Sequence, residues 1–149
     1  MALEPLRDAW APRVLSILRI MTALLLLQFG MAKMLAFPVH EYLNNVPRFS
    51  LPWFAGVLEL TGGVLLLIGL FTRPVAFILS GLMAFAYFIG HAPKGFYPLL
   101  NGGNLAVELC FLFLYLACAG GGVFGLDALL QRSGKERPAS SAAPAHRAA

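Results

Sequence analysis

The stretch that decides the fold class is residues 52–71, PWFAGVLELTGGVLLLIGLF, an apolar run interrupted by a single charge, Glu59. A helix of about 20 apolar residues is long enough to cross the hydrocarbon core of a bilayer. Backbone groups in that core must be hydrogen-bonded internally, which restricts the run to a helix or to a strand of a closed barrel. Because apolar and polar residues do not alternate along the run, we expect a transmembrane helix.

The whole chain has the composition of a membrane protein. Of its 149 residues, 59% are apolar and only 12% are charged, against about half and about a quarter in a soluble domain. This balance excludes a soluble globule and also a disordered protein. Since the length allows roughly four spans, the expected fold is all-α, a polytopic membrane four-helix bundle.

Three further apolar runs complete this prediction, at 14–32, 75–90 and 104–123. The first is interpreted as a retained span and not as a cleaved leader, because it contains Arg19 and no Ala-x-Ala site follows it. The expected organisation is an N-terminal segment at 1–13, a four-span domain at 14–130 and a disordered, Ala/Pro/Ser-rich tail at 131–149.

The basic residues predict the orientation of the bundle. Seven of them lie in the terminal segments and in the turn at 72–74, whereas the two other loops hold Lys33, Arg48 and Lys94. Cytoplasmic loops carry the excess of lysine and arginine. We therefore expect both termini in the cytoplasm, with loops 33–50 and 91–103 outside.

The two halves of the chain are weakly similar to each other. Val57-Leu58-Glu59-Leu60 in the second run corresponds to Ala106-Val107-Glu108-Leu109 in the fourth. Lys33 and Lys94 follow the first and the third run. This repeat predicts two helical hairpins in the same orientation.

Three full charges fall inside the runs, namely Arg19, Glu59 and Glu108. Each costs roughly 2.5–3.5 kcal/mol at a helix centre and so needs a partner or water. Arg19 could pair with Glu59 if its side chain extends toward the midplane, or with Glu108 over a longer reach. The sequence leaves this choice open. An ion pair that holds the bundle together and a site that handles protons or a ligand both fit these charges.

Helical spacing gives each run one face that bears polar residues. Pointed inward, these faces form a candidate polar core of Arg19, Glu59, His91 and Glu108 that opens to the outside. His91 lies at the outer mouth, where a histidine either relays protons near neutral pH or simply ends a helix. Asn104 is expected to cap the fourth helix. The secondary candidates are Lys33, Tyr87, Tyr115, Asn101 and Asn104.

The sequence does not favour several other kinds of site. No metal is expected, because the histidines and cysteines lack ligand spacing. Cys110 and Cys118 lie about 12 Å apart on one helix, too far for a disulfide. The basic residues form no patch for nucleic acid, and no cofactor motif or complete catalytic motif is present. Aromatic residues near the outer loops are interpreted as an interfacial belt in preference to a quinone-stacking surface.

The spacing of these motifs resembles the DoxX family of small four-helix membrane proteins. The resemblance covers residues 14–130 and rests on Arg19, Gly30, Lys33, Glu59-Leu60-x-Gly62-Gly63, Gly69-Leu70-x-Thr72-Arg73, His91-x-x-x-Gly95-Phe96-x-Pro98-x-x-Asn101-Gly102-Gly103, Glu108-x-Cys110-Phe111-x-Phe113 and Gly120-x-Gly122-x-x-Gly125-Leu126-Asp127. Where the family usually has glutamate after Asn-Gly-Gly, this chain has Asn104.

The resemblance implies a multi-pass protein of the bacterial inner membrane. Family members are described as subunits or partners of membrane oxidoreductase systems, including thiosulfate:quinone oxidoreductase. The resemblance therefore implies a membrane or soluble oxidoreductase partner, and a quinone as a compatible cofactor. On this reading the chain is an accessory subunit whose polar core binds quinone oxygens or moves the accompanying protons.

Two alternatives stay open beside the oxidoreductase subunit. A small proton-coupled carrier or exporter suits the repeat and the paired acids. Four short spans would need to form a homo-oligomer to enclose its path. A structural membrane scaffold is the other alternative.

Overall fold

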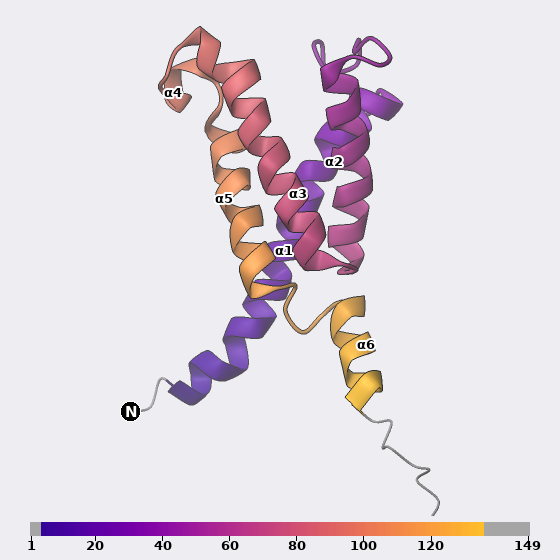
Figure 1. The fold of residues 1–149 in the computed structure, drawn as a ribbon, viewed down its shortest axis with the longest axis vertical. Helices are drawn as coiled ribbons and strands as arrows, with labels where there is room; N and C mark the ends of the chain where they lie inside the picture. Colours follow the sequence, from indigo (N-terminus) through magenta and orange to yellow (C-terminus); the bar gives the residue numbers. More distant parts are fainter. Residues whose placement is uncertain (1–3, 136–149) are drawn as a thin grey trace, which may run out of the picture.

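The computed structural model describes residues 4–135, and every regular element in that range is helical (Figure 1). The α-helices are α1 (Glu4–Leu35), α2 (Leu51–Ile68), α3 (Thr72–Phe85), α4 (Pro98–Asn101), α5 (Asn104–Ala119) and α6 (Leu126–Lys135). A π-helical segment, Ala86–His91, and a 3₁₀ turn, Ala92–Lys94, continue α3. The all-α prediction is confirmed for the described residues.

Three segments of the described chain are long and apolar enough to cross a membrane, namely Asp8–Leu35, Leu51–Ile68 and Thr72–Lys94. The third is longer than the expected 75–90, because the π-helical and 3₁₀ segments prolong the helix beyond α3. The fourth apolar helix, α5, has 16 residues and ends before the expected 123. Gly120 ends it in a conformation with positive φ.

Local sequence accounts for the sharp turn between α2 and α3. Gly69 adopts a left-handed conformation, with φ 71°, and Gly69 and Leu70 donate their N–H groups to carbonyls of the last turn of α2. This is a common way to close a helix on glycine. Asp127, at the start of α6, then accepts the N–H groups of Phe71 and Thr72 at 2.9 and 2.8 Å. A residue 55 positions away in sequence therefore caps α3.

The expected cap of α5 is different in the structure. Asn104 is the first residue of the helix, and Gly103 occupies the capping position without a side-chain hydrogen bond. The Asn101 side chain accepts the N–H of Gly103 at 2.7 Å. The prediction that Asn104 caps α5 is therefore wrong, because the helix begins at Asn104 itself, one residue earlier than a cap at Asn104 would require, after a turn in which Asn101 accepts the N–H of Gly103.

The helices pack as two pairs. α1 lies along α2, and α3 lies along α5; α2 and α3 make the larger contact between the pairs, and α1 touches α5 only slightly. In Figure 1 the pairs diverge toward the end that carries loops 36–50 and 92–103, called the loop end here. The opposite end carries the α2–α3 turn and α6 and is called the α6 end. α1 begins at the α6 end too, so both described ends of the chain lie at the same end of the molecule.

Buried apolar side chains from both pairs form one core between the helices. Its members come from α1, α2, α3 and α5: Ala23, Leu26, Leu66, Ala76, Leu79, Met83, Leu109, Phe113 and Leu116. Many large apolar side chains point away from this core and are exposed. Such an outer surface is what a helical protein presents to lipid.

The ends of the chain differ from the expected segments. α1 begins at Glu4, within the expected polar segment 1–13, and α6 runs to Lys135, within the expected disordered tail 131–149. Residues 1–3 and 136–149 lie outside the described residues, so the prediction of a disordered tail is not tested there.

Candidate functional site

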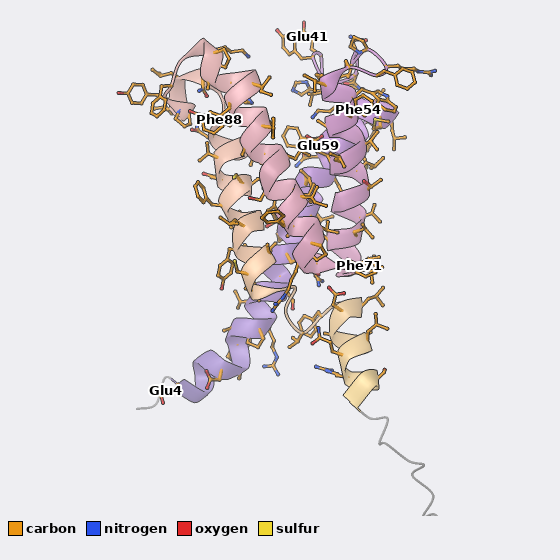
Figure 2. The ribbon with its side chains drawn as sticks, in the orientation of Figure 1. Glu4, Glu41, Phe54, Glu59, Phe71 and Phe88 are labelled. Atoms are coloured by element: carbon orange, nitrogen blue, oxygen red, sulfur yellow. The ribbon has the colours of Figure 1, made fainter. Side chains whose placement is uncertain are left out.

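Lys33 and Glu59 form a buried ion pair between α1 and α2. The Lys33 Nζ lies 2.7 Å from Oε1 and 2.8 Å from Oε2 of Glu59. The two side chains are only 12% and 6% exposed. Figure 2 shows Glu59 between the two arms of the fold, nearer the loop end than Phe71 of the α2–α3 turn. The ammonium group of Lys33 on α1 thus binds both oxygens of the Glu59 carboxylate on α2.

Glycines bring the two helices close enough for this pair to form. A methyl group at Gly30, one turn before Lys33, would lie 2.6 Å from the backbone N of Leu60. A methyl group at Gly56 would lie 2.9 Å from Cβ of Lys33. Small residues at such crossings allow helix backbones in membranes to approach closely. The crossing therefore sets the position of the ammonium group beside the carboxylate.

Lys33, and not Arg19, is the partner of Glu59. Arg19 pairs with neither Glu59 nor Glu108, because it lies 14 residues before Lys33 on α1, about 21 Å along the axis. Lys33 was expected in a loop, since the apolar run ends at 32, but α1 continues to Leu35. Counting depth from the loop end along a longer first helix would have placed Lys33 opposite Glu59.

Arg19 instead binds the segment that precedes α6. It is 2% exposed, and its Nη2 donates to the carbonyl of Phe124. Its Nη1 lies against three glycines, at positions 69, 121 and 125. A Cβ at any of these positions would crowd or overlap the guanidinium group. Nε has no hydrogen-bond partner within residues 4–135. The glycine motif near residues 120–127 therefore accommodates an arginine from α1.

Tyr87, His91 and Asn101 form a separate group at the loop end. The Tyr87 hydroxyl donates to the carbonyl of Phe96. His91 Nδ1 lies 3.1 Å from the carbonyl of Asn101, and Asn101 Nδ2 donates to the carbonyl of Gly95 at 2.6 Å. Each of these contacts goes to backbone, so the group shapes the segment between α3 and α5.

Glu108, Tyr115 and Asn104 are exposed on α5. The rotation of this helix is set by Leu109, Phe113 and Leu116, which are buried in the core and turn Glu108 outward. The structure thus does not bring Arg19, Glu59, His91 and Glu108 into one polar core. Among the four, Glu59 is the acid that is buried and paired.

The described residues contain no group of three or more histidine, cysteine or acidic side chains that could hold a metal ion. The two cysteines are free, as their spacing predicted. The buried pair of Lys33 and Glu59 is therefore the candidate site.

Comparison with known proteins places the chain among relatives. Residues 14–92, which include the Lys33–Glu59 pair and Arg19, match the model of the DoxX family. The chain belongs to the DoxX family. An uncharacterized protein of Haemophilus influenzae is 44% identical to this DoxX protein over 124 residues, covering 80% of this chain and 92% of the relative.

A second relative carries a location in its name. The inner membrane protein YqjF of Escherichia coli is 30% identical over 119 residues, covering 76% of this chain and 89% of YqjF. No solved structure matches the chain. The family and the apolar helices establish this DoxX protein as a membrane protein.

The close crossing of α1 and α2 can be tested by substituting Gly30, with Gly81 of α3 as the control. Gly30→Ala is expected to destabilise the protein by about 1–3 kcal/mol, because the new methyl group meets the Leu60 backbone. Gly81→Ala on α3 has open space around it and is expected to be neutral or to stabilise by about 0.5–1 kcal/mol. Unfolding by sodium dodecyl sulfate in mixed micelles measures both. Equal midpoints for the two variants would contradict the close crossing.

Proposed function

We propose that this DoxX protein is an accessory subunit of a quinone-linked oxidoreductase system in the bacterial inner membrane. α1, α2, α5 and the extended α3 all cross the bilayer in this proposal, with both termini in the cytoplasm. The excess of lysine and arginine at the α6 end supports this orientation, and the name of the E. coli relative supports the location. α5 lies along α3, which is itself long enough when its extension is included.

The observation that carries the proposal is the buried Lys33–Glu59 pair. Removing two charges from water is expensive even when they pair, and ionisable residues inside membrane helices commonly mark ligand or proton sites. An ammonium group has three N–H donors, of which two point to the Glu59 oxygens. The third suits a carbonyl oxygen, which is the polar group of a quinone.

A bound quinone supplies two-electron chemistry, with electrons arriving from the partner enzyme. The residues of this chain would orient the head group and handle protons. Lys33 would donate a hydrogen bond to a quinone carbonyl oxygen, and Glu59 would hold or release a proton beside it. This role needs no redox cofactor in the chain itself.

The placement of polar residues favours this reading over a carrier. Within residues 4–135, the polar groups do not form a continuous path. The Lys33–Glu59 pair and the His91 group lie toward the loop end, Arg19 lies at the α6 end, and the apolar core lies between the two ends. A proton-coupled carrier would need a polar path through that core.

Native co-purification tests the proposal. The tagged protein is extracted in polymer nanodiscs, and bound proteins and quinones are identified by mass spectrometry. Wild type is expected to retain a redox enzyme and quinone, and Glu59→Gln to lose at least the quinone. Glu41→Gln, in the exposed loop, is the matched control and should behave as wild type.

A second variant separates a functional role from a structural one. The double variant Lys33→Met/Glu59→Leu removes both charges without leaving either unpaired, so it should fold. It should still lose quinone and partner if the pair is the site. If it retains both, the pair serves only the scaffold, and a wild type that brings down neither would refute the oxidoreductase assignment.

A further inference from the structure

A cleft of about 490 Å³ lies at the α6 end, between the first turn of α3, the segment that joins α5 to α6, and one side of α6. Its volume is in the range of small-molecule sites. The lining includes Thr72 and Arg73 of α3 and the glycines 120–122 of the joining segment. Neither Lys33 nor Glu59 contributes to it, so the cleft is separate from the buried ion pair. We call it the α6 cleft.

The hydroxyl of Thr72 is a buried polar group without a partner. Thr72 is 1% exposed, and its Oγ1 has no hydrogen-bond partner within residues 4–135. The hydroxyl faces Gly121, another residue of the cleft lining, where a Cβ would lie 2.8 Å from Oγ1. Buried polar groups normally have a partner. The α6 cleft therefore offers a donor for which the described chain supplies no acceptor.

Arg19 brings further donors to the same place. A Cβ at Gly121 would lie 2.9 Å from Nη1 of Arg19 as well as close to the Thr72 hydroxyl. Nη2 donates to the carbonyl of Phe124, whereas Nη1 and Nε donate no hydrogen bond within the described part of the chain. Gly121 does not have the positive φ that favours glycine. The missing Cβ is therefore explained by the space that these donors occupy.

Two backbone N–H groups and a second guanidinium group add to these donors. The N–H groups of Gly121 and Gly122 make no hydrogen bond to any described residue. Arg73 is exposed and lies against Gly120, where a Cβ would be 3.5 Å from its Nε. It forms no ion pair with any residue in the range 4–135. Free N–H groups of a glycine-rich turn and guanidinium groups are typical ligands of phosphate.

Asp127 is the carboxylate that lines the α6 cleft. Its two oxygens already accept the N–H groups of Phe71 and Thr72. Arg19 lies close enough for its charge to offset that of Asp127. The charge of Arg73 is then left without a counterion, so the cleft favours an anion over a cation.

The α6 cleft lies where the polar surface of a bilayer is expected. α2 and the extended α3 are each long enough to cross a membrane, and the turn that joins them borders the cleft. Leu15, Phe71 and Val123 add apolar side chains to the lining. A cleft with both polar and apolar walls at this level suits a lipid headgroup better than a free ion, and the cytoplasmic leaflet is rich in anionic lipid.

We infer that the α6 cleft binds a phosphate group, supplied by the headgroup of an anionic phospholipid in the cytoplasmic leaflet. The inference rests on the proposed membrane crossing of α2 and α3 and on the cytoplasmic position of both termini. Arg73 pairs with the phosphate charge, and the N–H groups of Gly121 and Gly122 donate to its oxygens. Thr72 and Arg19 supply donors beside Gly121.

Lipid retention tests the inference. The protein is purified in mild detergent from bilayers of equal parts phosphatidylethanolamine and phosphatidylglycerol, and bound lipid is counted by native mass spectrometry. Wild type is expected to retain phosphatidylglycerol, and Arg73→Gln should retain several-fold less. Arg48→Gln removes the same charge from an exposed position in the loop between α1 and α2 and should behave as wild type. Equal retention by the two variants would overturn the inference.

Thr72→Val tests the unpaired hydroxyl with a side chain of nearly the same shape. It should lower retention of phosphatidylglycerol several-fold. The delipidated variant should unfold in sodium dodecyl sulfate no earlier than wild type, because no hydrogen bond within the described chain is lost. Thr61→Val is the matched control, since that hydroxyl donates to the carbonyl of Val57 on α2, and it should keep the lipid. Unchanged lipid retention by Thr72→Val would overturn the inference.

Inorganic phosphate distinguishes a lipid from a free ion. Delipidated protein is unfolded in the presence of phosphate, with chloride at equal ionic strength as the control. Phosphate protection that requires Arg73 and Thr72, without any retained phosphatidylglycerol, would overturn the lipid and assign a soluble phosphate to the cleft. Neither retained lipid nor phosphate protection would refute the site itself. These assays use no quinone, so their outcome is distinct from that of the co-purification.

Discussion

Lys33→Met is expected to lower the free energy of unfolding by about 3–5 kcal/mol, because it leaves the Glu59 carboxylate buried without its partner. Both carboxylate oxygens depend on that one ammonium group, and the Glu59 side chain is only 6% exposed. Unfolding by sodium dodecyl sulfate in mixed micelles, followed by far-UV circular dichroism, measures the loss.

Adding Glu59→Leu to Lys33→Met should restore most of the lost stability. A buried ion pair can often be replaced by apolar side chains at little cost, whereas breaking it is strongly destabilising. Lys94→Met is the matched control, since this lysine is exposed at the same end of the molecule; it should leave the midpoint unchanged. A double variant as unstable as the single one would contradict a simple charge pair at this crossing.

Gly69→Ala is expected to have the second large effect, through the packing of Arg19. Gly69 has φ 71°, which costs a residue with Cβ about 1–2 kcal/mol. Its new methyl group would also overlap the Arg19 guanidinium and lie 2.8 Å from Cα of Gly125. Overpacking of this kind adds about 1–3 kcal/mol. The α6 end should therefore open.

Gly102→Ala separates the two causes. Gly102 has nearly the same φ, 73°, but nothing lies within 4 Å of its added methyl group. It should show the backbone cost alone, so Gly69→Ala should be the less stable by about 1–3 kcal/mol in the same assay. Proteolysis near residue 125 should also speed up in Gly69→Ala only. Equal stability of the two variants would mean that Arg19 is not held in this space.

Hydropathy predicted three helices that are long and apolar enough to cross a membrane, because the need for about 20 apolar residues is a local property of the chain. The fourth run, at 104–123, formed only the 16-residue α5. Most of the run at 52–71 lies in α2, which ends at Ile68, and the runs at 14–32 and 75–90 lie within longer helices. The helix ends were less predictable. α1 continues past Lys33, since a charged side chain in the last turn is compatible with a helix once it has a partner.

The candidate site was predicted only in part. Glu59 was recognised from its charge within an apolar run, a signal that the residue type carries by itself. Its partner was not, because choosing between Arg19 and Lys33 requires the depth at which two helices cross. That depth is set by Gly30 meeting the backbone of Leu60, a contact between positions 30 residues apart.

By itself the sequence determined that this is an all-α membrane protein with charges that require partners, since span length and the cost of buried charge follow from residue type and order. Only the tertiary structure decided which charges are satisfied. In the structure Lys33 pairs with Glu59, Arg19 donates a hydrogen bond to the carbonyl of Phe124, and Glu108 lies on the outer face of α5. The reason is physical: helix rotation and crossing depend on how side chains from distant segments pack, and no local run of sequence specifies that.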